Sequence, residues 1–256
     1  CKRVMARGVA RRMRLIRRVH GACKAVLSIQ RRYCSCWIPA TTQVALALTL
    51  LFASTLALTA ADTQVNGVLG FDKRDVLVAH FSLPERSYTD AEKRRRFVNG
   101  VLERMRAMPA VSEAGFTSHI PSGFNDHGRK LWPEGAELTE AKARFVGYRR
   151  TSPNYFQAMR IPLVRGRGFG AEDRLESTAV AVVSESLARR YWPGQDAIGQ
   201  RFKLAADGPW LVVIGEAGDV LHNWATRRPE TVYRPISQDM PYSGDFTIRT
   251  VGDPEA

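Results

Sequence analysis

An uncharged, largely apolar stretch of the sequence runs from Ile38 to Ala61, and its centre, Val44 to Leu58, is almost wholly Val, Ala, Leu, Phe and Thr. A helix rises about 1.5 Å per residue, so about 20 such residues cross the ~30 Å hydrocarbon core of a bilayer. Inside lipid a helix satisfies its own backbone groups, and its hydroxyls bond back to carbonyls one turn earlier. The pattern predicts a membrane-spanning helix over residues 38–61.

Beyond that stretch, apolar and polar residues alternate from Leu77 to Leu83, which predicts a strand with one buried face. The sequence Thr89-Asp90-Ala91-Glu92 fits a capping box, with Thr89 as the residue that caps a helix. Pro109 stops this helix. Its expected apolar stripe consists of Phe97, Val101, Leu102, Met105 and Met108.

The remaining pattern mixes strands with one short helix. Residues 118–178 are rich in Gly, Pro and charge and are expected to form a loop-rich subdomain. Ser184 is expected to cap a helix that Pro193-Gly194 ends. Because strands and helices alternate without strict repetition, the predicted fold class is α+β. The predicted strands are 111–117, 143–148, 179–183, 200–204, 210–217, 231–233 and 246–250.

Charge is distributed unevenly along the 256 residues. Eleven of the 38 Lys and Arg lie in residues 1–61, which hold no Asp or Glu, so this segment carries most of the net charge of +13. A basic block that ends at an apolar stretch is typical of a membrane flank, whereas a nucleic-acid-binding protein is more evenly basic. The Lys-Arg-Arg-Arg run at 93–96 is interpreted as a solvated helix face. No nucleic-acid partner is expected.

The charge asymmetry also sets the topology. Under the positive-inside rule, residues 1–37 form a basic cytoplasmic tail and everything after about residue 62 lies outside the cytoplasm. Two alternatives remain open: a cleaved signal peptide, whose cleavage site Ala57 to Ala61 matches only in part, and a buried core helix. All four cysteines, including Cys34 and Cys36, lie in the tail, so the outer domain of residues 62–256 has no disulfide. No metal site is expected at Cys34-Ser-Cys36, because a partner pair is missing.

A search for chemistry finds few candidates. The sequence has no phosphate-binding GxxxxGK[ST] loop and no GxSxG elbow. Residues 166–171 match GxGxxG/A, but no long helix follows, so they are interpreted as a turn. Ser118-His119 with Asp126-His127 could suggest a hydrolase or metal site; a loop setting favours surface roles. The expectation is therefore no catalytic, cofactor-binding or metal residues. Structural roles are assigned to His80, His222, Trp192, Trp210 and Trp224.

The amino-acid sequence of the outer region resembles that of a known family. The segments that carry the resemblance occur in order over about four-fifths of the chain: residues 70–88, 154–169, 180–204, 212–224, 230–236 and 246–256. Together they resemble the extracytoplasmic, MacB-like periplasmic core domain of MacB/FtsX-type ABC transporter permeases. Two departures stand out: Arg160 occupies a position where the family usually has Gly, and residues 1–40 do not resemble the usual start.

This resemblance implies a fragment of a permease subunit in a bacterial inner membrane. The outer domain would couple ATP hydrolysis on a separate cytoplasmic ATPase subunit to export or to mechanical signalling in the envelope. A second permease unit or a dimer, and membrane lipid, are the other expected partners. Two alternatives remain: a membrane-tethered binding or sensor module without transport, and a secreted hydrolase built on His119, Asp126 and His127.

Overall fold

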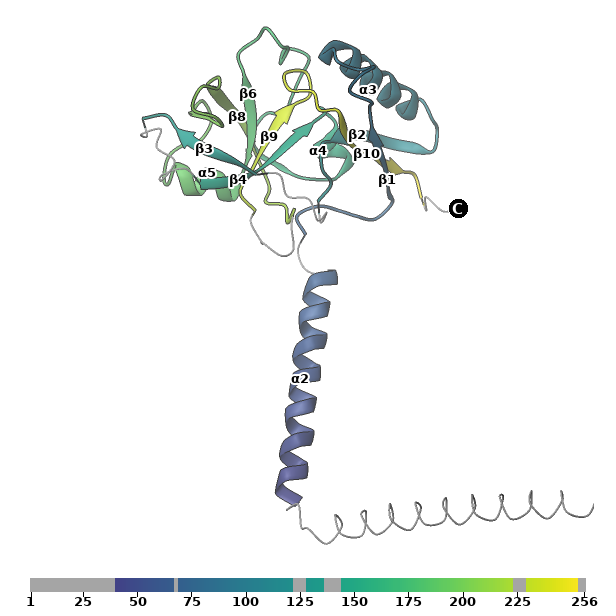
Figure 1. The fold of residues 1–256 in the computed structure, drawn as a ribbon, viewed down its shortest axis with the longest axis vertical. Coiled ribbons are helices and arrows are strands. Elements are labelled where there is room, and N and C mark those ends of the chain that lie inside the picture. Colours follow the sequence, from purple (N-terminus) through teal and green to yellow (C-terminus); the bar gives the residue numbers. More distant parts are fainter. Residues whose placement is uncertain (1–39, 67–68, 122–127, 136–143, 223–228, 253–256) are drawn as a thin grey trace, which may run out of the picture. The chain divides into compact units, whose positions relative to one another are not determined.

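The computed structural model describes residues 40–66, 69–121, 128–135, 144–222 and 229–252, with side chains of the first range at 45–60. It divides into two compact units, residues 1–65 and 66–256. In the first unit, helix α2 covers Ala40–Asn66 (Figure 1). Across the described ranges we find no helix that combines the length and apolar character needed to cross a membrane. The transmembrane segment predicted over 38–61 therefore stays a prediction, and the basic tail 1–37 lies outside the described residues.

The second unit is a mixed α/β domain, as expected. Its strands form one ten-stranded sheet with path β1-β10-β2-β4-β3-β7-β8-β6-β9, and β5 pairs with β8 (Figure 1). In chain order the elements are β1 (Val76–Ser82), α3 (Ala91–Arg106), β2 (Val111–Thr117), β3 (Gly128–Pro133), β4 (Arg144–Thr151), α4 (Tyr155–Ala158), β5 (Leu163–Gly166), β6 (Val180–Ser184), α5 (Glu185–Tyr191), β7 (Arg201–Lys203), β8 (Leu211–Ala217), β9 (Thr231–Pro235) and β10 (Ser243–Thr250).

The sheet has two parts that meet at one described residue pair. Strands β1, β10 and β2 form a three-stranded part, and β2 joins the seven other strands only through Thr117 opposite Thr151. Helix α3 covers one face of the three-stranded part, where Val98 and Leu102 pack on Phe116. The two other core clusters lie in the larger part and around α4. The loop-rich subdomain at 118–178 stays a prediction; β3, β4, α4 and β5 lie within that range.

Two details of α3 correct the sequence prediction. The N-cap is Asp90, whose carboxylate accepts the Glu92 N–H at 2.9 Å, and not Thr89. Asp90 lies one residue closer to the helix than Thr89, so its side-chain oxygen reaches the free backbone amides of the first turn over a shorter distance. The buried residues of α3 are Arg94, Val98 and Leu102. Of the predicted stripe, Leu102 is buried, and Val101 and Met105 pack against the same core. The buried face is therefore rotated from the predicted one toward Arg94 and Val98. Phe97 and Met108 instead remain 36% and 53% exposed on the flank.

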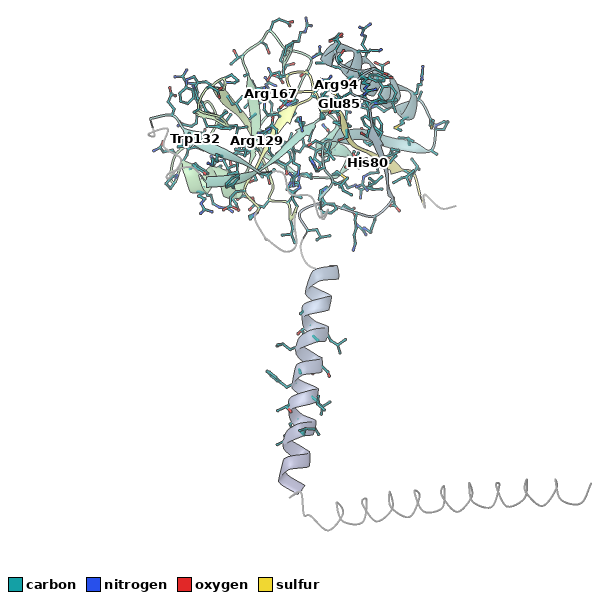
Figure 2. All side chains as sticks on the ribbon, in the orientation of Figure 1. His80, Glu85, Arg94, Arg129, Trp132 and Arg167 are labelled. Atoms are coloured by element: carbon teal, nitrogen blue, oxygen red, sulfur yellow. The ribbon has the colours of Figure 1, made fainter. Side chains whose placement is uncertain are left out.

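The rotation of α3 has a polar cause. The buried Arg94 guanidinium donates to the carbonyls of Tyr88 (2.6 Å) and Thr89 (3.0 Å) and stacks on the Tyr242 ring at 4.0 Å (Figure 2). These carbonyls belong to the turn before the helix, so satisfying them turns Arg94 toward the sheet. Periodicity counts Arg as a surface residue and therefore cannot anticipate this orientation.

Candidate functional site

The segment that follows α2 in the chain, residues 69–75, is held firmly to the domain; we call it the connecting segment. Its main anchor is Arg249 of β10, which is only 4% exposed. The Arg249 guanidinium donates to the carbonyls of Asp72, Arg74 and Ala158, each at 2.8 Å. The first two carbonyls belong to the connecting segment and the third to α4. One side chain therefore ties the segment, β10 and α4 together.

Side-chain charges reinforce this anchor. The Asp72 carboxylate accepts hydrogen bonds from Arg74 (3.1 Å) and from Arg160 (2.8 Å), which follows α4. The bonds from Arg74, with a smaller contribution from Arg160, hold the pKa of Asp72 well below its usual range. Asp72 is therefore ionised at any physiological pH, and it forms an ion pair with Arg160 that joins the connecting segment to the end of α4.

Backbone contacts close the remaining side of the segment. The Leu69 carbonyl accepts the Leu221 N–H at 2.9 Å, and the Asp72 N–H donates to the Met159 carbonyl at 3.1 Å. Gly70 has φ 78°, and a Cβ built there would lie 1.8 Å from the Asp219 carbonyl oxygen. Only glycine fits this close approach. The connecting segment is thus fixed to the domain by backbone contacts as well as by side chains.

The residues proposed for hydrolase chemistry are not assembled into a site by the described residues. Ser118 Oγ lies 3.1 Å from His119 Nδ1 and accepts the Arg150 N–H at 3.1 Å. The Ser118 N–H donates to the Arg150 carbonyl at 2.8 Å. These contacts fasten the end of β2 to β4. Asp126 and His127 lie outside the described residues, so the structure neither joins them to His119 nor separates them from it.

The glycine-rich run at 166–171 begins at the end of β5 and continues as a loop. Gly166 ends β5 with φ 67°. Arg167 pairs with both oxygens of Asp173 at 2.7 and 2.8 Å, and the Gly170 N–H donates to the same carboxylate. The backbone amide that a phosphate would need is therefore already engaged by Asp173. The arrangement is that of a loop closed by an ion pair.

The histidines singled out in the sequence have structural contacts. His222 is 2% exposed, and its Nε2 lies 2.8 Å from the Tyr233 hydroxyl. Burial, with nearby Arg149, lowers the pKa of His222 well below its usual range, so the ring is neutral. His80 on β1 lies 2.8 Å from Asp245 on β10 and is exposed (Figure 2). Among the described residues no three His, Cys, Asp or Glu side chains gather to hold a metal ion.

The tryptophans divide between core and surface. Trp192 is 6% exposed and packs in the largest core cluster. Trp210 precedes β8 and lies beneath Lys203 and Arg201, 5.0 and 5.6 Å from its ring centre. The first has the packing role predicted for it, and the second stabilises a hairpin. Trp224, like Cys34 and Cys36, lies outside the described residues.

The structure is thus a mixed α/β domain that follows an apolar helix in the chain. The polar contacts described above hold segments of this domain together. The chain belongs to the MacB-like periplasmic core domain family, whose pattern it matches over residues 43–251. Domains of this family are parts of ABC transporter permeases and are in general not catalytic. The recognition made from the sequence is confirmed. No curated protein matches the chain.

Solved structures also match the chain, among them the three that follow. The periplasmic region of MacB from Actinobacillus actinomycetemcomitans is 14% identical with a TM-score of 0.47, covering 73% of this chain and 78% of that one. A domain of a permease protein from Porphyromonas gingivalis is 16% identical (TM-score 0.46, coverage 72% and 80%). The extracellular domain of the transporter YknZ from Gram-positive bacteria is 14% identical (TM-score 0.44, coverage 69% and 84%).

Sequence reasoning missed the connecting segment as a site. Its anchors are backbone carbonyls, and the residue that binds them, Arg249, is distant from the segment in sequence. One signal was available: the resemblance to the family led us to expect Gly at the position of Arg160. The structure gives Arg160 a φ of 51° and an ion pair with Asp72.

Proposed function

We propose that this chain is the first membrane helix and extracytoplasmic domain of a MacB/FtsX-type ABC transporter permease, and that the domain relays motion between the membrane and the cell envelope. The observation that carries the proposal is the anchoring of the connecting segment. A relay needs a stiff link between the helix that moves and the domain that responds. Residues 69–75 are bound through Arg249 to β10 and through Arg160 to α4.

The character of α2 supports its role as the anchor. Its side chains from 45 to 60 are exposed all around the helix, with Leu46, Phe52 and Leu58 at 66, 72 and 71% (Figure 2). An exposed helix that is apolar on every side is suited to lipid and not to water. Its hydroxyls are satisfied internally: Ser54 donates to the Leu50 carbonyl at 2.7 Å and Thr55 to the Leu51 carbonyl at 2.8 Å. In the sequence the uncharged stretch extends further, from Ile38 to Ala61.

The proposed arrangement assigns the chemistry to other subunits. ATP hydrolysis takes place on a cytoplasmic partner, and a second permease unit or a dimer mate completes the membrane path. The basic tail stays in the cytoplasm of a bacterial cell, and residues after about 62 lie outside it. The domain acts through shape and contacts, as part of a two-state mechanical element that needs no catalytic residue of its own.

Topology is tested by thiol labelling in intact cells. The four native cysteines are replaced by Ser, and Ala206→Cys is introduced on the exposed β7–β8 turn. A membrane-impermeant maleimide is expected to label this variant at full length. The matched control is Ala181→Cys, which is 0% exposed and should react only after denaturation. Labelling of Ala206→Cys that requires cell lysis refutes the outer location. Labelling of a product shortened by about 60 residues, the length of the segment up to Ala61, supports a cleaved signal peptide.

The relay is tested by loosening the connecting segment in the complete permease. Arg249→Gln cannot reach three carbonyls, so it should uncouple the transport phenotype from ATP hydrolysis while leaving the Ala206 labelling pattern unchanged. The control, Arg96→Gln, removes an arginine whose side chain is 72% exposed and should have no effect. Full activity of Arg249→Gln would refute the relay. A phenotype that survives an inactive ATPase would instead favour the tethered sensor module.

A further inference from the structure

One face of the larger part of the sheet carries three arginines from three neighbouring strands. Side chains alternate along β4, so Val146, Tyr148 and Arg150 share a face, and their cross-strand partners share it with them. Arg129 of β3 (Figure 2) is the partner of Val146. Arg234 of β9 is the partner of Arg150. We call Arg129, Arg150 and Arg234 the arginine cluster.

The ring of Tyr148 lies beneath this cluster. Tyr148 is buried, and the guanidinium carbons of Arg129 and Arg150 lie 5.7 and 5.8 Å from the centre of its ring. Arg129 is exposed, and the side chain of Arg150 keeps 23% of its surface open to solvent. A ligand from solution can therefore reach the cluster while the aromatic ring shields its inner side from water.

The carboxylate near the cluster neutralises only part of its charge. Among the described residues, Asp239 is the one acid that forms an ion pair with any of the three arginines, and its Oδ1 lies 3.5 Å from Arg150 Nη1. The Tyr148 hydroxyl donates to the other oxygen of Asp239 and so fixes the position of the carboxylate. Three arginines and one carboxylate leave a net charge of +2 at this place on the sheet.

Two of these like charges stand directly opposite each other. Arg150 and Arg234 are partners in the parallel pairing of β4 and β9, and like charges at such positions destabilise a sheet. Within the described part of the chain, Arg234 donates to the neutral side-chain oxygen of Gln238 at 3.3 Å. The same oxygen already accepts the Val180 N–H at 3.0 Å. An anion held by both guanidinium groups would offset their repulsion and use donors that the described residues leave idle.

The number and type of these cations indicate a phosphate group. Guanidinium groups bind phosphate through pairs of parallel N–H donors, and arginine suits this geometry better than lysine. A phosphate monoester carries about −1.5 to −2 at neutral pH, which matches the net charge of the cluster with Asp239 better than a singly charged carboxylate does. We propose that the arginine cluster binds a phosphate monoester group, with Arg150 and Arg234 as ligands and Arg129 as a third cation. The cluster lies within one compact unit, so the proposal is independent of the relay.

Thermal unfolding in inorganic phosphate tests the site. The full chain, in maltoside micelles that contain no phosphate, is compared in phosphate and in chloride at equal ionic strength and at about pH 8, where phosphate is mostly dianionic. A ligand that binds only the folded state raises Tm. Phosphate also stabilises proteins that have no site for it, because it is excluded from their surfaces. The quantity of interest is therefore the rise in Tm of the native chain minus the rise in a variant.

Two variants of the cluster and one control supply this difference. Arg234→Gln should weaken phosphate binding on the order of 10-fold, because it removes a charged donor, and should lose most of the site-specific rise in Tm. Arg129→Gln, at an exposed position where folding is safe, should lose part of it. The control Arg96→Gln removes an arginine of α3 whose side chain is 72% exposed, and it should keep the full rise. Equal rises in the native chain and all three variants overturn the proposal.

Three further ligands identify the group and its source, each compared in the native chain and in Arg234→Gln. Acetate that produces the same difference as phosphate would overturn the phosphate assignment in favour of a carboxylate. Glycerol phosphate is a soluble monoester, and dodecyl phosphate presents the same group from within the micelle. A difference with glycerol phosphate supports a free ligand, and a difference with dodecyl phosphate alone supports a lipid headgroup. No difference with either monoester overturns the proposal.

Discussion

Arg160 offers a sharp test of how the connecting segment is held. The end of α4 has the hydrogen bonds of a Schellman motif: the Ile161 N–H donates to Phe156 (2.8 Å) and the Arg160 N–H to Gln157 (3.0 Å). The residue at the Arg160 position must be left-handed, which is why glycine is usual there. Arg160 adopts φ 51° all the same. Its guanidinium reaches Asp72 at 2.8 Å, with the Arg160 side chain 58% exposed.

Two substitutions separate the strain from the ion pair. Arg160→Ala removes the pair and keeps the left-handed Cβ, so it should destabilise the domain by about 0.2–1 kcal/mol, the range for an exposed pair. Arg160→Gly removes the same pair but relieves about 1–2 kcal/mol of left-handed strain. Glycine also adds about 0.4–1 kcal/mol of unfolded-state entropy, which offsets part of this gain. The Gly variant should therefore be more stable than the Ala variant by roughly 0.5–1 kcal/mol.

Urea unfolding of the compact unit 66–256 measures this difference. A Gly variant that is less stable than the Ala variant would refute the strain at Arg160. A double-mutant cycle of Arg160→Ala with Asp72→Asn then isolates the pair, and we expect a coupling below about 1 kcal/mol. A coupling of several kcal/mol would mean that the exposed pair is desolvated, contrary to its exposure.

Three other predictions concern packing and pH. Gly115→Ala should destabilise the domain by about 1–3 kcal/mol, because the new Cβ would lie 2.7 Å from Tyr155 Cα; the control Gly100→Ala in α3 meets nothing within 4 Å and should be neutral or stabilising in the same urea assay. Burial lowers the pKa of His222, so its stabilising contribution is complete above about pH 6.5 and is lost as the pH falls; His222→Gln should flatten the fall in Tm below that pH, and an unchanged slope would contradict a neutral buried ring. Burial raises the pKa of Glu216, so its contribution is present below about pH 4.3 and lost as the pH rises; Glu216→Gln should raise Tm at pH 7 and not at pH 4, and the opposite order would disprove the effect of burial.

Local patterns were a good guide to individual elements. The strand predicted at 111–117 is Val111–Thr117, and Ser184 caps α5 as expected, accepting the Leu187 N–H. Both depend on neighbouring residues, which periodicity and capping rules describe directly. Strands β3 and β5 were not predicted. Gly128–Pro133 contains Gly, Pro and two cations, and Leu163–Gly166 has four exposed residues, so both are strands only because a partner strand lies beside them.

The candidate site could not be predicted for a related reason. Residue types and spacing reveal clusters of catalytic side chains, but the connecting segment is held by carbonyl oxygens, which every residue has. Arg249 lies in the alternating pattern of a strand, and the sequence does not reveal the carbonyl groups to which it donates. The burial of an arginine is determined by the carbonyls around it, and these come together only when β10, α4 and residues 69–75 meet.

The left-handed Arg160 shows what this anchoring requires. A glycine at this position would fit the turn without strain and would leave Asp72 with Arg74, its neighbour two residues away, as its ion-pair partner. Both residues of that local pair belong to the connecting segment, so the pair does not attach the segment to the rest of the domain. The pair with Arg160 joins the segment to α4, a separate element, and does so at a cost in backbone strain. If the connecting segment passes force from a membrane helix to the domain, a link between elements resists that force, whereas a link within the segment does not. In that case the arginine in this left-handed position strengthens the junction between two elements at the expense of the turn.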